Sequence, residues 1–422
     1  MKYAIVTFGC RVNQADSISI ERQLRSFGGY PVPTDEAELV VINTCSVTAT
    51  ADHGARQIIR RIARTNPSAR IVATGCYATR ASQDLAKLPK VTDVIANSNK
   101  DKMVAQLLLD QSLTTSERFG DGDGACGQTI RPGTAGRTSA LLRVQTGCDE
   151  ACAYCIIPST RGSGRSMPVA SVLAEVDRMA DEGFKEAAIT GVHLGSYGRD
   201  LSPPSSLLEL LRSLEHHPSN LLFRMSSLEP MDCIPEIVNL VACSERFAPH
   251  FHLPLQNASN RMLQAMRRPY TSGYYQRLVD SIREKLPHAA IGSDFIVGFP
   301  GETDVDFETN MSFLRDSPIT YLHVFPYSDR PGTAATQLPV KVPGATIRDR
   351  GRAIRAIGTQ LAARFCKAQI GTVRQALTID GGNVAVTDNY LKVRIVSSLK
   401  ENERVNVKIL ASKETLIGEV IG

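Results

Sequence analysis

Three cysteines, Cys148, Cys152 and Cys155, lie within eight residues, and an aromatic residue, Tyr154, stands directly before the last of them. Thiolate is the soft ligand that iron prefers in iron–sulfur clusters, so three thiolates on one short loop indicate a [4Fe–4S] cluster. Such a cluster has four irons. Three cysteine ligands therefore leave one iron open for a substrate or a cofactor.

A structural zinc site is the alternative for these cysteines. It needs a fourth ligand to close a tetrahedron, and His193 is a distant candidate for that place. The paired C-x2-C spacings that are typical of zinc sites are missing, so the spacing favours the cluster. A ferredoxin-like carrier is disfavoured because its run of cysteines is longer and its chain is much shorter. After the cysteines, Pro158 and Gly162 predict an ordered loop rather than a helix.

Three further cysteines each follow a predicted strand in the N-terminal part of the chain. The expected strands and their cysteines are 2–8 with Cys10, 38–43 with Cys45, and 70–74 with Cys76. Helical segments lie between them, at 14–27 and 52–65, and this alternation predicts a parallel sheet with helices on its faces. Ligands bind along the edge where the carboxyl ends of such strands meet. The cysteines should therefore converge and hold a second cluster with an open iron; chance placement of cysteines in a core is the alternative.

The length of 422 residues predicts two or three domains. Ten cysteines without a signal peptide indicate a reducing cytoplasm, where cysteines serve as ligands or catalysts. No apolar run is long enough to span a bilayer, so no membrane partner is expected. The net charge of +5 is too small to indicate a nucleic-acid partner by itself. Basic residues cluster at 56–70 and 348–367, where they could bind phosphates or form a solvated helix face.

Strands and helices alternate again between residues 138 and 340, and six such units fit a partial (β/α) barrel. In barrels the chemistry takes place at the carboxyl ends of the strands. The expected strands are 140–145, 186–191, 222–226, 250–255, 290–297 and 321–326. The expected helices are 168–182, 204–214, 233–243, 259–266, 273–286 and 304–316.

The end of the chain changes character. Five short strands are expected near 373–378, 384–387, 391–395, 404–409 and 416–420. They predict a small antiparallel β-barrel of the type that binds oligonucleotides, with a structural β cap as the alternative. Residues 113–137, which are rich in glycine, predict a flexible linker, and Cys126 within it is interpreted as incidental.

The motif formed by Cys148, Cys152, Tyr154 and Cys155 resembles that of the radical S-adenosylmethionine (SAM) enzymes. The resemblance implies that SAM chelates the open iron, and that one electron from the cluster cleaves SAM to a 5′-deoxyadenosyl radical. Other segments resemble the methylthiotransferases of that superfamily, which carry an auxiliary [4Fe–4S] cluster in an N-terminal domain. These segments are Phe8–Gln14, Asn43–Thr48 and Thr74–Cys76. The resemblance covers essentially the whole chain.

This family has three main branches, which act on isopentenyladenosine in tRNA, on threonylcarbamoyladenosine in tRNA, and on an aspartate of a ribosomal protein. The segment Gly9–Gln14 resembles the threonylcarbamoyladenosine branch, in which a lysine usually stands in place of Arg11. The segment Cys45–Thr48 also fits that branch, whereas Val12–Gln14 argues against the ribosomal-protein branch.

The resemblance also implies ligands and domains. The auxiliary cluster is expected on Cys10, Cys45 and Cys76, and the SAM-binding cluster on Cys148, Cys152 and Cys155. Expected SAM contacts are Tyr154, Gly191, Ser226, Ser227, Glu229 and Gln256. The expected domains are 1–112 around the auxiliary cluster, 138–367 as the radical SAM barrel with a basic C-terminal helix, and 368–422 as a TRAM-like RNA-binding domain.

The implied reaction adds a methylthio group to C2 of the adenine next to the anticodon. The auxiliary cluster would carry the sulfur, and SAM would both methylate it and supply the radical that abstracts hydrogen. The expected partners are the tRNA anticodon stem-loop, an external electron donor and an external sulfur source. Besides the other two branches, a non-catalytic iron–sulfur RNA-binding protein stays open as an alternative, and it would not turn over SAM.

Overall fold

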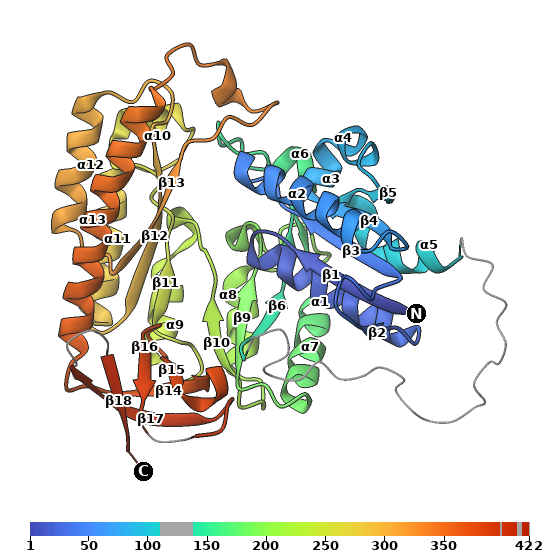
Figure 1. The fold of residues 1–422 in the computed structure, drawn as a ribbon. Helices are drawn as coiled ribbons and strands as arrows, with labels where there is room; N and C mark the ends of the chain where they lie inside the picture. Colours follow the sequence, from blue (N-terminus) through green and yellow to red (C-terminus); the bar gives the residue numbers. More distant parts are fainter. Residues whose placement is uncertain (110–137, 397–398, 412–415, 422) are drawn as a thin grey trace.

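The computed structural model describes residues 1–109, 138–396, 399–411 and 416–421. Figure 1 shows an α/β part in blue, a central part of strands and helices in green to orange, and a small β-barrel in red. The predicted linker 113–137, with Cys126, lies outside the described residues. The domain boundaries stay a prediction.

The N-terminal part is a parallel sheet in the order β2-β1-β3-β4-β5. Its strands are β1 (Lys2–Thr7), β2 (Tyr30–Pro31), β3 (Leu39–Thr44), β4 (Arg70–Gly75) and β5 (Val91–Ile95). The three strands expected from the sequence are all present. Sequence reasoning did not find β2 and β5, which are edge strands whose exposed or half-buried residues give little apolar signal.

Helices cover both faces of this sheet. They are α1 (Arg11–Ser26), α2 (Ala49–Thr65), α3 (Cys76–Arg80), α4 (Ser82–Ala86) and α5 (Met103–Leu109), with a 3-10 helix, η1 (Asn97–Lys102), before α5. Along β3, Val40 and Ile42 pack against α2, whereas Leu39 and Val41 pack against α1 and α5. The helices that follow β1 and β3 thus lie on opposite faces. Sheets of this order bind ligands where the winding direction reverses, at the carboxyl ends of β1 and β3.

The central part contains two parallel three-stranded sheets, in the orders β10-β9-β6 and β11-β12-β13. The strands are β6 (Ala140–Arg143), β9 (Glu186–Thr190), β10 (Leu222–Met225), β11 (His250–His252), β12 (Ala290–Val297) and β13 (Tyr321–Pro326). A parallel bridge between Ser227 and His252 joins the two sheets. The six strands therefore form the predicted partial barrel, which stays open between β6 and β13.

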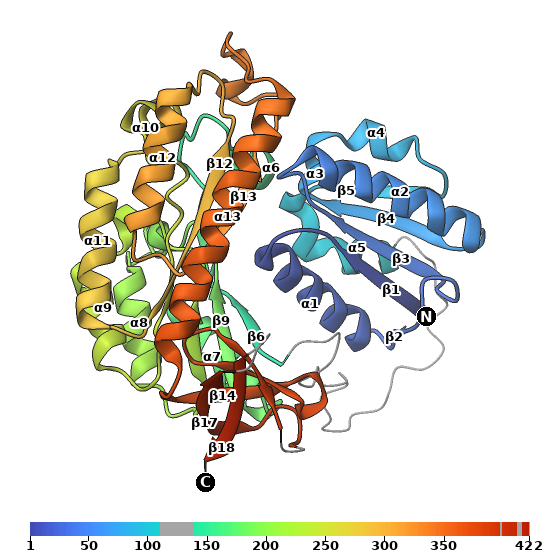
Figure 2. The ribbon, with the colours of Figure 1, turned by 60° about the vertical axis from the view of Figure 1, so that its left-hand side comes forward.

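Helices surround the outside of these strands (Figure 2). They are α7 (Val169–Asp181), α8 (Leu207–Glu215), α9 (Pro235–Cys243), α10 (Asn260–Ala265), α11 (Ser272–Lys285), α12 (Asp304–Asp316) and α13 (Gly344–Gln369). One contiguous core lies between the helices and the strands, with Leu142, Ile189 and Phe251 among its buried members. The N-terminal part docks through α1, whose Ala15 packs on Leu141 of β6.

A short helix, α6 (Ile157–Arg161), corrects one sequence expectation. The sequence predicts a loop after the cysteine motif because Pro158 stands there. The proline lies in the first turn of α6, where its missing N–H costs no hydrogen bond. A two-stranded ribbon, β7 (Gln145–Thr146) and β8 (Arg165–Ser166), brackets the motif and this helix.

The C-terminal part is a closed barrel in the order β14-β15-β16-β18-β17. Its strands are β14 (Val373–Ile379), β15 (Val384–Thr387), β16 (Lys392–Ile395), β17 (Arg404–Ala411) and β18 (Leu416–Ile421). The five predicted strands are present, but β16 and β18 pair in parallel rather than antiparallel. Among the described residues, no helix has the length and apolar character that crossing a membrane requires.

Candidate active site

The three N-terminal cysteines meet at the carboxyl edge of the sheet. Cys10 follows β1 and precedes α1, Cys45 follows β3, and Cys76 is the first residue of α3 after β4. The thiol of Cys45 is close enough to those of Cys10 and Cys76 for their charges to interact. We call these three residues the strand-end triad.

Glycines let the backbone pass close to this triad. Gly9 has a φ of +91°, and a Cβ there would lie 2.5 Å from Sγ of Cys45. Gly75 has a φ of +99°, and its Cβ would lie 2.2 Å from the carbonyl oxygen of Thr44. Any other residue would be strained at both places and would push neighbouring strand ends apart. The Gly-Cys pairs in the sequence are therefore a requirement of the geometry.

A buried arginine, Arg161 of α6, stands beside the strand-end triad and interacts with the charges of Cys10 and Cys76. Burial raises the pKa of Cys45 to about 11, so its thiol needs a nearby cation to ionise. Burial would lower the pKa of Arg161, but Asp16 and the thiols outweigh it and hold that pKa above its ordinary value. The charge of Arg161 thus offsets part of the cost of ionising Cys45, although burial still keeps the pKa of that thiol raised.

The other three cysteines, Cys148, Cys152 and Cys155, lie on the loop between β7 and α6, and we call them the loop triad. Burial raises the pKa of Cys155 to about 12. Here too an arginine accompanies the sulfurs, because Nη1 of Arg268 donates to Sγ of Cys152 at 3.2 Å.

Arg268 also pairs with the carboxylate of Glu229 and is only 8% exposed. In the sequence Arg268 follows a predicted helix, a position that indicates a solvated helix end or a contact with RNA phosphates. The burial of Arg268 and its pairing with Glu229 contradict both interpretations. The helix before it ends at Ala265, and the chain then turns Arg268 inward to the loop triad. Glu229, an expected SAM contact, is engaged by this arginine.

His193, the distant candidate for a zinc ligand, does lie beside the loop triad. Its Nδ1 is 3.9 Å from Sγ of Cys148, and its Nε2 is 2.8 Å from Oδ2 of Asp232. Burial lowers its pKa, but the hydrogen bonds to Asp232 and Cys148 raise the pKa of His193 to about 10. A histidine that prefers its protonated form is a poor metal ligand and instead stabilises an adjacent anionic sulfur.

Buried ionic contacts join the N-terminal part to the barrel beside the strand-end triad. Asp16 of α1 accepts from Nη2 of Arg161 at 3.0 Å and from Nζ of Lys100 at 2.9 Å, and it also pairs with Arg143. Asn13 accepts from Arg161 at 2.8 Å. The side chains of Asp16, Lys100 and Arg161 are each 5% exposed or less. The N-terminal part is thus fixed to α6, the helix that follows the loop triad in the chain.

Two cavities adjoin the triads. The larger, about 450 Å³, is lined by Cys10 and Arg11 of the N-terminal part and by Gly191, Ser226 and Ser227 at the strand ends of the barrel. The smaller, about 200 Å³, is lined by Tyr154, Cys155 and Gln256. Five of the six expected SAM contacts therefore line one cavity or the other.

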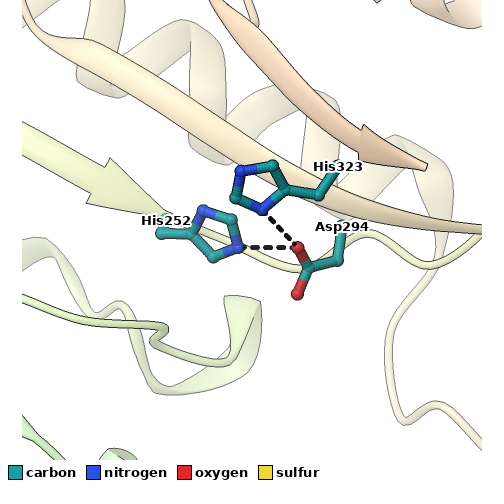
Figure 3. Close-up of side chains that lie close together, drawn as sticks. All are labelled: His252, Asp294 and His323. Atoms are coloured by element: carbon teal, nitrogen blue, oxygen red, sulfur yellow. Dashed lines mark hydrogen bonds and ion pairs between the residues drawn. The ribbon is translucent and has the colours of Figure 1, made fainter. Parts of the chain in front are cut away.

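His252, Asp294 and His323 belong to the lining of the larger cavity. Their side chains point toward one another (Figure 3). Nε2 of His252 and Nδ1 of His323 lie 3.0 and 3.2 Å from the same carboxylate oxygen of Asp294. Burial raises the pKa of Asp294, but these hydrogen bonds outweigh it and hold that pKa well below its ordinary value. The hydroxyl of Tyr321 continues the chain to Nδ1 of His252 and to His250. The possible metal-ligand atoms of His252, Asp294 and His323 lie within 4.8 Å of one another. The carboxylate oxygen that the two histidines share already accepts two hydrogen bonds, so the contacts present are those of a hydrogen-bonded group.

Comparisons with known proteins identify the family. Residues 142–314 match the model of the radical SAM superfamily, and residues 2–97 match that of the Uncharacterized protein family UPF0004. A threonylcarbamoyladenosine tRNA methylthiotransferase MtaB of Aquifex aeolicus is 37% identical over 93% of this chain and 96% of the relative. The chain belongs to the radical SAM methylthiotransferases.

Two other relatives also align with most of this chain and with most of their own length. The MtaB of Bacillus subtilis is 33% identical over 92% of this chain and 89% of its own length. A tRNA-2-methylthio-N(6)-dimethylallyladenosine synthase of Caldicellulosiruptor saccharolyticus is 31% identical over 99% of this chain and 92% of its own.

Among solved structures, the fold is similar to that of the radical SAM methyltransferase TsrM from Kitasatospora setae. That match has a TM-score of 0.54 at 14% identity and covers 79% of this chain and 73% of the other. The cobalamin-dependent radical enzyme OxsB matches with a TM-score of 0.51 at 10% identity, over 86% of this chain and 56% of the other. At these identities the likeness concerns the fold alone.

Proposed function

We propose that this protein adds a methylthio group to C2 of N6-threonylcarbamoyladenosine next to the anticodon of tRNA, using SAM and two [4Fe–4S] clusters. The observation that carries the proposal is that the two cysteine triads lie at two neighbouring cavities between the N-terminal part and the barrel. Cys10 lines the larger cavity, Cys155 lines the smaller one, and Val47 and Asp294 line both. The MtaB relatives, at up to 37% identity over nearly the whole chain, support the choice of the threonylcarbamoyl substrate.

The residues of each triad fit a [4Fe–4S] cluster. Each site offers three thiols and a buried arginine that offsets the negative charge of thiolate-bound iron, namely Arg161 at the strand-end triad and Arg268 at the loop triad. Three ligands at each site leave one iron open. The clusters would supply the electron that cleaves SAM and the site that carries the sulfur.

The chain itself would bind, orient and enclose the reactants. Ser226, Ser227 and Gly191 would hold SAM at the strand ends of the barrel, and Tyr154 and Gln256 would line its place beside the loop triad. Glu229 would act through Arg268, which it orients toward Cys152. The buried contacts of Asp16 would keep the N-terminal part, and with it the strand-end triad, at a fixed position relative to the barrel. A reaction that uses both triads needs such a fixed geometry.

The C-terminal barrel would contact the anticodon stem-loop, as expected of a TRAM-like domain. An external electron donor and an external sulfur source complete the proposed set of partners, and the reducing cytoplasm is the proposed compartment.

Mass spectrometry of tRNA nucleosides tests the proposal. Cells that lack the gene should accumulate threonylcarbamoyladenosine and lose its 2-methylthio form, and the purified holoenzyme should restore that form on the isolated tRNA. Loss of methylthio-isopentenyladenosine instead would contradict the proposed substrate but would agree with the proposed methylthiolation reaction. Unchanged tRNA nucleosides would overturn both.

A further inference from the structure

Arg11 differs from Arg161 and Arg224, two other arginines at the interfaces between the three parts. Arg161 pairs with Asp16, and Arg224 pairs with Glu186 at 2.8 Å. The guanidinium of Arg11 instead donates to two neutral hydroxyls. Nη1 lies 3.2 Å from Oγ of Ser226 in the barrel, and Nη2 lies 3.2 Å from the hydroxyl of Tyr390 in the C-terminal barrel. Among the described residues, no carboxylate lies within ion-pair distance of Arg11.

Arg11 lines the cavity of about 450 Å³. The other arginine in that lining, Arg161, pairs with Asp16, and the carboxylate in the lining, Asp294, lies within hydrogen-bond distance of two histidines. Arg11 is therefore the arginine of this lining that has no carboxylate partner among the described residues. A guanidinium in a partly desolvated cavity binds a carboxylate with two parallel, charge-assisted hydrogen bonds.

The position of Arg11 in the chain matters as much as its charge. It directly follows Cys10 of the strand-end triad, from which the sulfur would be transferred to C2. In adenine, C2 and C6 both flank N1, so a substituent on N6 lies along the same edge of the base as C2. A residue that binds this substituent must lie close to the triad, and Arg11 does.

We propose that Arg11 binds the carboxylate of the N6-threonylcarbamoyl group and so selects this substrate over adenosines with an uncharged N6 substituent. This inference rests on the proposed function and extends it. The threonylcarbamoyl group carries a free carboxylate, whereas an isopentenyl group is a hydrocarbon that would leave the guanidinium unpaired in the cavity. Ser226 and Tyr390 act as positioning residues that hold the guanidinium across the interface.

Equilibrium binding of two synthetic RNAs tests the inference. One is an anticodon stem-loop with N6-threonylcarbamoyladenosine, and the other is the same RNA with the carboxylate converted to its methyl ester. The reconstituted holoenzyme is titrated with each, and the ratio of the two dissociation constants is compared between variants. Because the ratio is taken within one protein, it does not depend on how much of a variant is folded or loaded with clusters.

The wild-type protein should bind the acid about tenfold to a hundredfold more tightly than the ester, as expected for charge-assisted hydrogen bonds. In Arg11→Gln the ratio should fall to about one, and in Arg11→Lys, which keeps the charge, part of the preference should return. Tyr390→Phe, which removes only the hydroxyl that holds Nη2, should lower the preference by about twofold to fivefold.

An Arg11→Gln variant that keeps the wild-type ratio would overturn the inference. If that variant loses affinity for SAM and keeps the RNA ratio, Arg11 binds the carboxylate of SAM instead; if both RNAs weaken equally, it contacts the RNA backbone. A wild-type enzyme that binds the acid but methylthiolates only isopentenyladenosine RNA would contradict the proposed function rather than the role of Arg11.

Discussion

The loop triad comes from one stretch of eight residues, whereas the strand-end triad is assembled from the ends of three strands that helices separate in the sequence. Each has a buried arginine beside its sulfurs. At the loop triad, Arg268 is held by Glu229, another residue of the barrel. At the strand-end triad, the arginine is Arg161, which belongs to the barrel and is held by Asp16 of the N-terminal part.

This difference shows how the two sites depend on the rest of the fold. The loop triad needs only the barrel for its geometry and its cation. The strand-end triad needs the register of the parallel sheet for its geometry and the docking of two parts for its cation. Changes at the docking contacts should therefore affect the strand-end triad first.

The largest effect is expected from Cys152→Ala in the loop triad. SAM cleavage to 5′-deoxyadenosine should be abolished, and with it all methylthiolation, because both depend on the cluster that these thiolates hold. Chromatography of 5′-deoxyadenosine with mass spectrometry of the RNA measures both. Cys243→Ala, at an exposed helical cysteine, is the matched control and should leave both unchanged. Substantial SAM cleavage by Cys152→Ala would contradict the assignment of the loop triad.

Cys45→Ala should distinguish the function of the strand-end triad from that of the loop triad. SAM cleavage should continue without methylthiolation, because the loop triad is intact and the sulfur-carrying site has lost a ligand. Iron analysis of the reconstituted protein should show about half of the wild-type content, since one of two equal clusters is lost. Full product formation by this variant would show that the strand-end triad does not carry the sulfur.

Asp16→Ala removes the carboxylate through which the N-terminal part pairs with Arg161 of the barrel. It leaves Lys100 and Arg161 buried without their anionic partner, which should lower the free energy of unfolding by about 3–5 kcal/mol. Denaturant titration measures the change. Asp329→Ala, which breaks an ion pair of half-exposed side chains with Lys341, is the control and should cost less than about 1 kcal/mol. Equal losses in the two variants would mean that the buried network does not stabilise the docking.

The smallest effect concerns pH. Lys100, Arg161 and Arg143 outweigh burial and hold the pKa of Asp16 well below its ordinary value of about 3.9. A depressed pKa gives stability that is fully present above the unfolded value and is lost only as pH falls through the folded one. The stability difference between wild type and Asp16→Asn should therefore stay constant from pH 7 down to about 4.5. Below that pH the difference should shrink as the unfolded chain takes up the proton. A difference that stays constant down to about pH 3 would mean that Asp16 titrates near its ordinary pKa, because an unshifted group adds no pH dependence to stability.

Sequence patterns predicted most of the elements that carry the site. The three strands that end at Cys10, Cys45 and Cys76 and the six barrel strands follow from apolar runs and their spacing, because burial on a sheet selects such runs. Two features misled the prediction. Pro158 indicates a break in a helix, but it is tolerated in the first turn of α6. Arg268 indicates a surface charge, but its side chain donates to Sγ of Cys152.

The sequence by itself determined the six cysteines, the order of the strands along the chain and the parallel direction of the sheet, because residue types and local periodicity encode these. Only the tertiary structure decided which arginine serves which triad, that Glu229 is paired, and that Tyr390 reaches Arg11 across 379 positions of sequence. Such contacts depend on how separately folded layers dock. The sequence gives only the type of a charged residue, which is the same whether its side chain is exposed to solvent or lines a cavity between two parts of the chain.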